Sequence, residues 1–205
     1  MTEITRGDRI KLVIATGNRN KIREIQEKFA GMEWLSLVPL GDFPDPPEVI
    51  EDGRTFRENA LKKASAIAAY TGLPAMADDS GLVVDALGGR PGVLSARYGG
   101  EAADDTAKNG MILEEMRGVP AELRAARFVC VIAVAFPGGK HVTAEGTCEG
   151  VITDAMKGSH GFGYDPIFFL PDRGMTMAEL PLEEKNKISH RAKALEAMRE
   201  ILLKL

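Results

Sequence analysis

The chain has 205 residues, of which 44% are hydrophobic and 27% charged, and this balance excludes a disordered chain. Its formal net charge of −4 excludes a general attraction to nucleic acid, so an anionic ligand would need a local cluster of donors. No apolar run approaches the roughly 20 residues that span a bilayer, and residues 1–9 contain no apolar signal core. Cys130 and Cys148 lack metal-ligand spacing and fit a reducing compartment. We therefore expect a cytoplasmic protein that binds neither nucleic acid nor membrane.

The first quarter of the chain predicts a strand, a helix and a second strand. The β-branched run at residues 11–15 predicts a buried strand that ends in a turn. Apolar residues at helical spacing predict a helix from Lys21 that stops at Gly31. Residues 35–40 predict the next strand, and the proline-broken stretch at 41–52 predicts a loop.

The middle of the chain predicts two more helices with short strands between them. Residues 55–71 carry an apolar helical face that ends before a glycine. Residues 74–77 predict a short strand, and residues 82–86 are its expected hairpin partner. A further helix is expected from the capping aspartates at 104–105 to residue 117.

The last part of the chain predicts a long hairpin, a loop and a final helix. Residues 127–136 and 141–153 flank a Pro-Gly-Gly turn, which indicates the hairpin. The glycine-rich stretch at 158–163 predicts a loop, and one apolar stripe predicts a helix from about Lys187. This order of elements indicates an α/β protein with a mixed sheet.

Four polar clusters interrupt this pattern, and the first lies between the first strand and the first helix. Backbone N–H groups at a helix start suit phosphate oxygens, and Asn18 and Lys21 could add donors. The spacing is neither that of a P-loop nor that of a dinucleotide fingerprint. The alternative is a simple turn in which Asn18 caps the helix and Lys21 is solvated.

The second cluster is acidic. Glu51 and Asp52 close the proline-rich loop, and the stretch at 78–81 begins with two aspartates at a predicted strand end. Adjacent carboxylates repel each other unless a cation offsets the charge, and Mg²⁺ prefers oxygen ligands. A carboxylate beside such an ion can also activate water. The alternative is a solvated turn in which an aspartate bonds its own backbone.

The third cluster is the glycine-rich loop at 159–166. Its glycines allow close approach of a ligand, Phe162 offers a face for stacking on a base, and Asp165 could read a base edge. The alternative is a turn whose aromatic side chains close the core.

The fourth cluster opens the final predicted helix. Lys185, His190 and Arg191 are donors that suit carbonyl or phosphate oxygens. The alternative is an ordinary basic helix start. Ser189 and His190 are sequence neighbours, which does not make a nucleophile–base pair.

Six segments of the chain match a known family in order. The chain resembles the inosine triphosphate pyrophosphatases, also described as dITP/XTP pyrophosphatases. The matching segments are Ala15-Thr-Gly-Asn-x-x-Lys21, Thr55-Phe-x-Glu-Asn-Ala60, Ala77-Asp-Asp-Ser-Gly-Leu82, Pro91-Gly-Val-x-Ser-Ala-Arg-Tyr98, Gly161-Phe-Gly-Tyr-Asp-Pro-Ile-Phe168 and Ser189-His-Arg191. A match of several parts in order is far more specific than any one motif.

The resemblance implies a long, mixed, twisted sheet flanked by helices, with two lobes and a central active-site cleft. It assigns residues 11–205 to one domain and leaves residues 1–10 as an N-terminal extension. It implies a homodimer that requires Mg²⁺. The implied reaction hydrolyses inosine, deoxyinosine and xanthosine triphosphates (ITP, dITP and XTP) to monophosphate and pyrophosphate, which cleanses the nucleotide pool.

The resemblance also implies roles for individual residues. Asp79 matches the proton acceptor and a metal ligand, and Glu51 matches a second metal-associated acid. The residues that match substrate contacts are Thr16, Gly17, Asn18, Arg19, Asn20, Lys21, Ser80, Phe162, Gly163, Tyr164, Asp165, Lys185, His190 and Arg191.

Two other functions remain open at this stage. One is a pyrophosphatase for modified pyrimidine triphosphates, and the other is a non-catalytic regulator that binds nucleotide. The regulator would keep Phe162 and the basic cluster but would not need Asp79 or a metal.

Overall fold

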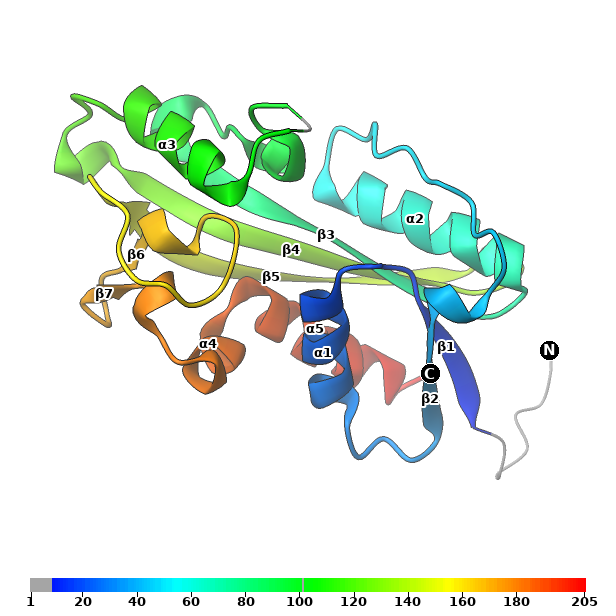
Figure 1. Cartoon of the computed structure of the whole chain (residues 1–205). Helices are drawn as coiled ribbons and strands as arrows, with labels where there is room; N and C mark the ends of the chain where they lie inside the picture. The colour runs from blue at the N-terminus through cyan, green and yellow to red at the C-terminus, as the bar shows by residue number, and fades with distance from the viewer. Residues whose placement is uncertain (1–8, 101) are drawn as a thin grey trace. The chain divides into compact units, whose positions relative to one another are not determined.

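The computed structural model describes residues 9–100 and 102–205 (Figure 1). The expected N-terminal extension at residues 1–10 lies outside the described residues except at its last two positions, and the first strand already includes Ile10. In the part of the chain that is described, no helix is long and apolar enough to cross a membrane.

One mixed sheet of seven strands organises the described residues, in the order β2-β1-β3-β4-β5-β6-β7. The strands are β1 Ile10–Ile14, β2 Leu35–Pro39, β3 Ala75–Val84, β4 Ala125–Ala135, β5 His141–Ile152, β6 Phe168–Leu170 and β7 Met175–Thr176. β1 is parallel to both β2 and β3, while β6 is antiparallel to β5 and β7. The predicted α/β class and mixed sheet are therefore confirmed.

Five α-helices accompany the sheet within the described ranges. They are α1 Arg19–Phe29, α2 Phe56–Thr71, α3 Asp105–Glu115, α4 Leu182–Ile188 and α5 His190–Leu202. Short 3-10 helices lie at Leu40–Asp42, Asp85–Leu87, Gly92–Arg97, Ala121–Leu123, Asp165–Ile167 and Met177–Glu179.

Local capping chemistry fixes several helix ends where the sequence predicts them. The Thr55 hydroxyl accepts from the Glu58 amide at the start of α2, and Gly72 ends this helix in the left-handed conformation. The Asp104 carboxylate accepts from the Ala107 amide at the start of α3. The predicted β4–β5 hairpin is also confirmed, and its turn is closed by a 2.8 Å bond from the Phe136 amide to the Lys140 carbonyl.

The predicted hairpin between 74–77 and 82–86 is wrong, because β3 runs without a turn from Ala75 to Val84. Gly81 allows the strand to pass close to a neighbouring segment: a Cβ there would lie 2.3 Å from the Ser95 hydroxyl oxygen. That hydroxyl accepts from the Leu82 amide at 2.9 Å. The Asp-Asp-Ser-Gly stretch therefore continues a strand instead of forming a turn.

The predicted single helix from about Lys187 is also wrong, because Ser189 separates α4 from α5. Ser189 has an extended backbone, and its hydroxyl accepts from the Ala192 amide at 3.1 Å. A serine that caps a new helix competes with continuation of the old one. Lys185 therefore belongs to α4, whereas His190 and Arg191 begin α5.

The contacts divide the chain into two compact units. The first unit contains residues up to 79 together with 131–144 and 194–205, and the second contains 80–130 and 145–193. β3 leaves the first unit after Asp79 and enters the second at Ser80. The assignment of residues 11–205 to one domain stays a prediction.

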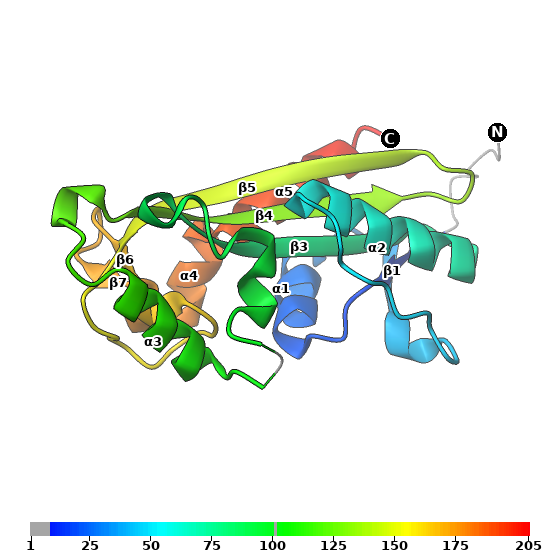
Figure 2. The ribbon, with the colours of Figure 1, turned by 90° about the horizontal axis from the view of Figure 1, so that it is seen from above.

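Each unit has its own layers and core. In the first unit, α2 lies on one face of the strands and α1 on the other (Figures 1 and 2). Small residues on α2, among them Ala60 and Ala64, are fully buried together with the β1 residues Val13 and Ile14. In the second unit, Phe168 belongs to a buried core cluster that also includes residues from β3, α3, β4 and β5.

Candidate functional site

The turn between β1 and α1 is capped by its own side chains. The Asn18 side-chain oxygen accepts from the amides of Asn20 (3.0 Å) and Lys21 (3.3 Å). The Thr16 hydroxyl accepts from the Asn18 amide at 3.2 Å. The capping role weighed for Asn18 is therefore confirmed, and two of the amides considered for phosphate are engaged by it.

Lys21 is not a solvated lysine. Its Nζ lies 2.9 Å from Oδ2 of Asp78, whose side chain is only 3% exposed. Asp78 belongs to β3, so this ion pair ties the first turn of α1 to the strand that carries Asp79. A buried carboxylate needs such a partner because its desolvation is costly.

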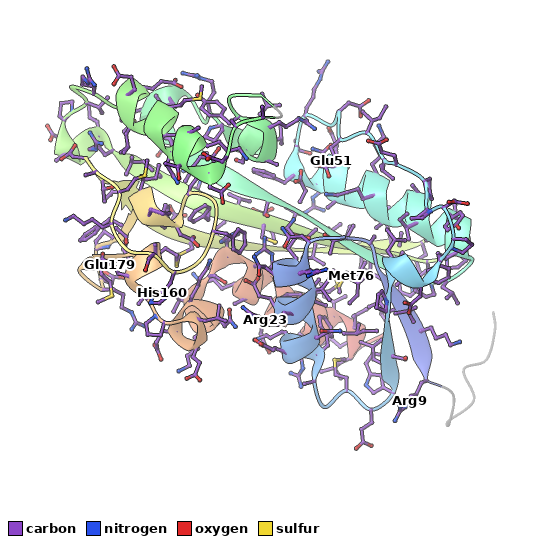
Figure 3. The ribbon with its side chains drawn as sticks, in the orientation of Figure 1. Arg9, Arg23, Glu51, Met76, His160 and Glu179 are labelled. Carbon is purple, nitrogen blue, oxygen red and sulfur yellow. The ribbon has the colours of Figure 1, made fainter. Side chains whose placement is uncertain are left out.

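A cavity of about 260 Å³ in the first unit is lined by both the β1–α1 turn and the loop that precedes α2. Its polar lining includes Thr16, Lys21, Glu51 and Lys63. Glu51 lies on the segment that leads into α2 (Figure 3). Lys63 is on α2, and its Nζ lies 2.7 Å from Glu51 Oε1. Two clusters predicted separately from the sequence therefore share one cavity that also holds two lysines.

Asp79 is a buried carboxylate in an environment of mixed charge. Burial raises its pKa most strongly; Lys63, a hydrogen bond from Asn59 and Lys21 lower it, while Glu51 raises it. The Asn59 amide nitrogen donates to Asp79 Oδ2 at 3.0 Å. A carboxylate whose pKa is raised by burial is suited to accept a proton.

The acidic residues offer oxygen ligands for a metal. Within residues 9–100 and 102–205, no group of three or more His, Cys, Asp or Glu side chains could hold a metal ion by itself. Mg²⁺ commonly takes only one or two carboxylates, with substrate phosphates completing the coordination. Glu51 and Asp79 are a donor set of that kind. The negative charge of Glu51 also raises the pKa of Asp79.

In the second unit, the glycine-rich loop places Phe162 between cations. Lys185 Nζ lies 4.5 Å from the centre of the Phe162 ring, and the Arg191 guanidinium carbon lies 5.7 Å from it. The Asp165 carboxylate pairs with Lys185 and accepts from the Phe162 amide at 2.9 Å. In this structure Oδ2 of Asp165 therefore holds the loop; its reading of a base edge stays a prediction.

Helix α3 clamps the same loop from another side. The Gly163 amide donates to Asp105 at 2.6 Å, and the Asn109 side chain donates to the Gly163 carbonyl at 2.8 Å. The Tyr164 hydroxyl donates to the Ser95 carbonyl at 2.9 Å. Both sides of one glycine are thus fixed, which holds Phe162 in place without using its ring.

The start of α5 completes the second group of residues. Arg191 donates to the Ser80 hydroxyl at 3.0 Å. The His190 ring stacks on Phe128, with 4.8 Å between the ring centres. Ser80, Phe162, Lys185 and Arg191 therefore lie together, and their roles as substrate contacts stay predictions. Asp79 and Ser80 are neighbours in β3, so the chain itself joins the two groups.

The sequence-based prediction assigned no role to Asn59, Lys63, Asp105 or Asn109. Asn59 and Lys63 lie four residues apart on α2, and Asp105 and Asn109 lie four apart on α3. This spacing places the two side chains of each pair on the same helix face. That spacing was the available signal. Asn59 also lies inside one of the six matching segments.

Comparisons with known proteins agree with this arrangement. The model of the Ham1 family matches residues 12–201. A dITP/XTP pyrophosphatase of Geobacter sulfurreducens is 57% identical over 192 residues, which is 94% of this chain and 96% of that protein. A dITP/XTP pyrophosphatase of Thermus thermophilus is 53% identical over 192 residues, which is 93% of this chain and 91% of that protein.

Solved structures give the same result for the fold. A HAM1 protein from Coxiella burnetii has a TM-score of 0.90 and 41% identity, over 96% of this chain and 100% of that chain. The Ham1 protein of Staphylococcus aureus has a TM-score of 0.87 and 38% identity, over 95% of this chain and 98% of that chain. On the evidence of its sequence, its fold and these two polar groups, the chain belongs to the Ham1 family.

Proposed function

We propose that the chain hydrolyses the triphosphates of non-standard purines, dITP, ITP and XTP, to nucleoside monophosphate and pyrophosphate. The observation that carries this proposal is the cavity of the first unit, which Lys21, Lys63 and Glu51 line beside a helix start, while Lys21 also pairs with Asp78. Lysines suit phosphate oxygens, and the acids suit a metal and a water nucleophile. The substrate class follows the names of the relatives, which are dITP/XTP pyrophosphatases.

The metal in this proposal is Mg²⁺, held by Glu51 and Asp79. When bound, it would neutralise charge on the phosphates and lower the repulsion between the two carboxylates. Lys21 and Lys63 line the same cavity and add positive charge for the triphosphate oxygens. The Asn18 cap keeps the turn in one conformation, so that Lys21 is presented from a fixed helix start.

Asp79 is the proposed proton acceptor. Its burial raises its pKa toward the range in which a base accepts a proton from water most usefully. The hydrogen bond from Asn59 orients its carboxylate. Asp79 therefore orients or deprotonates the water that attacks between the α- and β-phosphates.

The second unit supplies the residues for the base in this proposal. Phe162 is held by the loop and its clamp and offers a face for stacking, while His190 and Arg191 are the donors for a 6-oxo group. Adenine presents an amino group at that position, which would leave a buried donor unpaired. Guanine shares the 6-oxo group, so discrimination against it requires contacts at its 2-position.

The test is Mg²⁺-dependent release of pyrophosphate from dITP, ITP and XTP against the four common nucleotides and a modified pyrimidine triphosphate. We expect turnover of the three non-standard purines and little of ATP. ATP hydrolysed as fast as ITP would refute the assigned donors, and preference for the pyrimidine would establish the other enzyme class. ITP left intact by the chain in saturating Mg²⁺ would instead establish a binding protein.

The proposal includes a homodimer in the cytoplasm, as the family resemblance implies. Light scattering on a sizing column should then give about twice the chain mass of 22.1 kDa. A mass equal to that of one chain would remove the dimer from the proposal.

A further inference from the structure

The Asn59 side chain joins the two acidic segments of the first unit. It is fully buried, at 0% exposure. Its amide nitrogen donates to Asp79 Oδ2 at 3.0 Å, and its side-chain oxygen accepts from the Gly53 amide at 2.8 Å. We infer that Asn59 is a positioning residue that holds the Asp79 carboxylate and the loop bearing Glu51 at one fixed separation. The inference rests on the proposed function, because it concerns how the proposed metal ligands are placed.

The loop is built to receive this side chain. A Cβ at Gly53 would lie 2.5 Å from the Asn59 oxygen and 2.9 Å from Glu58 Cβ. Only glycine can therefore approach the first turn of α2 this closely. The next amide, that of Arg54, donates to Glu58 Oε2 at 2.6 Å. Two successive amides of the loop, which follow Glu51 closely in the chain, are thus hydrogen-bonded to side chains at the start of α2.

The same face of α2 also holds the Glu51 side chain. Lys63 lies one helical turn after Asn59 and makes the 2.7 Å ion pair with Glu51. Asn59 therefore fixes the backbone of the loop and the carboxylate of Asp79, while Lys63 holds the carboxylate of Glu51. The helix acts as a rigid template for both acids, and Asn59 hydrogen-bonds to both segments.

Residues that orient metal ligands commonly change metal affinity or activity about 10–100-fold when replaced. Replacing Asn59 by leucine keeps the number and branching of the side-chain heavy atoms but removes both hydrogen bonds. The Asp79 carboxylate then loses a donor and the Gly53 amide loses its acceptor. We expect Asn59→Leu to weaken divalent-ion binding and to lower kcat for dITP within that range. KM for dITP should change much less, since Lys21 and the residues of the second unit stay intact.

The experiment first measures Mn²⁺ binding to the full chain by the EPR signal of the free ion. Mn²⁺ accepts the same oxygen ligands as Mg²⁺, and this readout does not depend on turnover. The Mg²⁺ concentration that half-activates dITP hydrolysis is measured on the same samples. Thr71→Val is the matched control, because it removes a 2.8 Å hydrogen bond to the Ile67 carbonyl at the other end of α2.

The inference predicts weaker Mn²⁺ binding and a higher half-activating Mg²⁺ concentration for Asn59→Leu, with both values unchanged for Thr71→Val. Gly53→Ala keeps Asn59 but forces the loop away from it, and it should shift both values in the same direction. It decides the question by itself if Asn59→Leu does not fold. Unchanged metal affinity in folded Asn59→Leu or Gly53→Ala would overturn the inference. A wild-type chain that binds Mn²⁺ but does not hydrolyse dITP would refute the proposed function instead.

Discussion

Gly161 lies where a side chain would collide with a buried ion pair. Its φ of +80° belongs to the left-handed region. A Cβ there would lie 2.0 Å from Asp165 Oδ2 and 3.1 Å from Lys185 Nζ. Both charged side chains are almost fully buried, with 4% and 5% exposure. Gly161→Ala should therefore displace the carboxylate that pairs with Lys185 and holds the Phe162 amide.

Two costs add in this variant. A left-handed conformation costs a residue with a Cβ about 1–2 kcal/mol. Removing one partner of a buried ion pair costs about 3–5 kcal/mol, and a displaced partner loses part of that. We expect Gly161→Ala to lower the free energy of unfolding by about 3–5 kcal/mol in total, from the sum of these two effects. The shifted loop should also raise KM for dITP.

Gly163→Ala is the matched control, because Gly163 has a φ of +66° but a Cβ there meets nothing within 4 Å. Its free energy of unfolding should fall only by the backbone cost of about 1–2 kcal/mol. Urea unfolding of both variants, followed by circular dichroism, gives the comparison. If Gly161→Ala is destabilised no more than Gly163→Ala, the collision with the ion pair is not what makes Gly161 necessary.

Three further predictions follow from charges in the structure. Asp79→Asn should lower turnover about 10²–10⁴-fold, because the variant lacks the general base. The same substitution should change stability: burial raises the pKa of Asp79, so the ionised carboxylate opposes folding at neutral pH. The variant should therefore unfold at higher urea than wild type at pH 7 without Mg²⁺, and this gain should vanish below about pH 4, the ordinary pKa of the group. Lys21→Met should lower the free energy of unfolding by about 2 kcal/mol, since it leaves buried Asp78 without its 2.9 Å partner; equal urea midpoints would contradict this role. Burial also raises the pKa of the Tyr164 phenol. The stability that the neutral phenol contributes to folding is therefore complete below about pH 10 and is lost as pH rises further. Tyr164→Phe should show a weaker loss of stability above that pH than wild type, as measured by unfolding midpoints at pH 9 and 11.

The comparison of prediction and structure separates local from distant interactions. The helix starts at Asn18, Thr55 and Asp104 and the helix end at Gly72 were predictable. A cap bonds amides only two or three residues away, and a left-handed helix end needs one glycine. The main strand runs and the β4–β5 hairpin were also predictable, because alternating or β-branched runs and a Pro-Gly-Gly turn act between residues close in the sequence. The turn predicted at 78–81 was wrong, because aspartate, serine and glycine favour turns only where no strand pairing or buried partner competes.

The sequence by itself thus determined the fold class, the elements from β1 to α2, the β4–β5 hairpin, several helix ends and the polar segments that make up the candidate site, but not β6, β7 or the break between α4 and α5. Only the tertiary structure decided which groups pair: Lys21 with Asp78, Asn59 with Asp79, and Asp105 with the Gly163 amide 58 positions away. It also decided that Asn18 caps its helix and that Asp165 closes its loop. The physical reason is that capping and periodicity act over a few residues, whereas a buried charge takes whichever partner packing brings within reach.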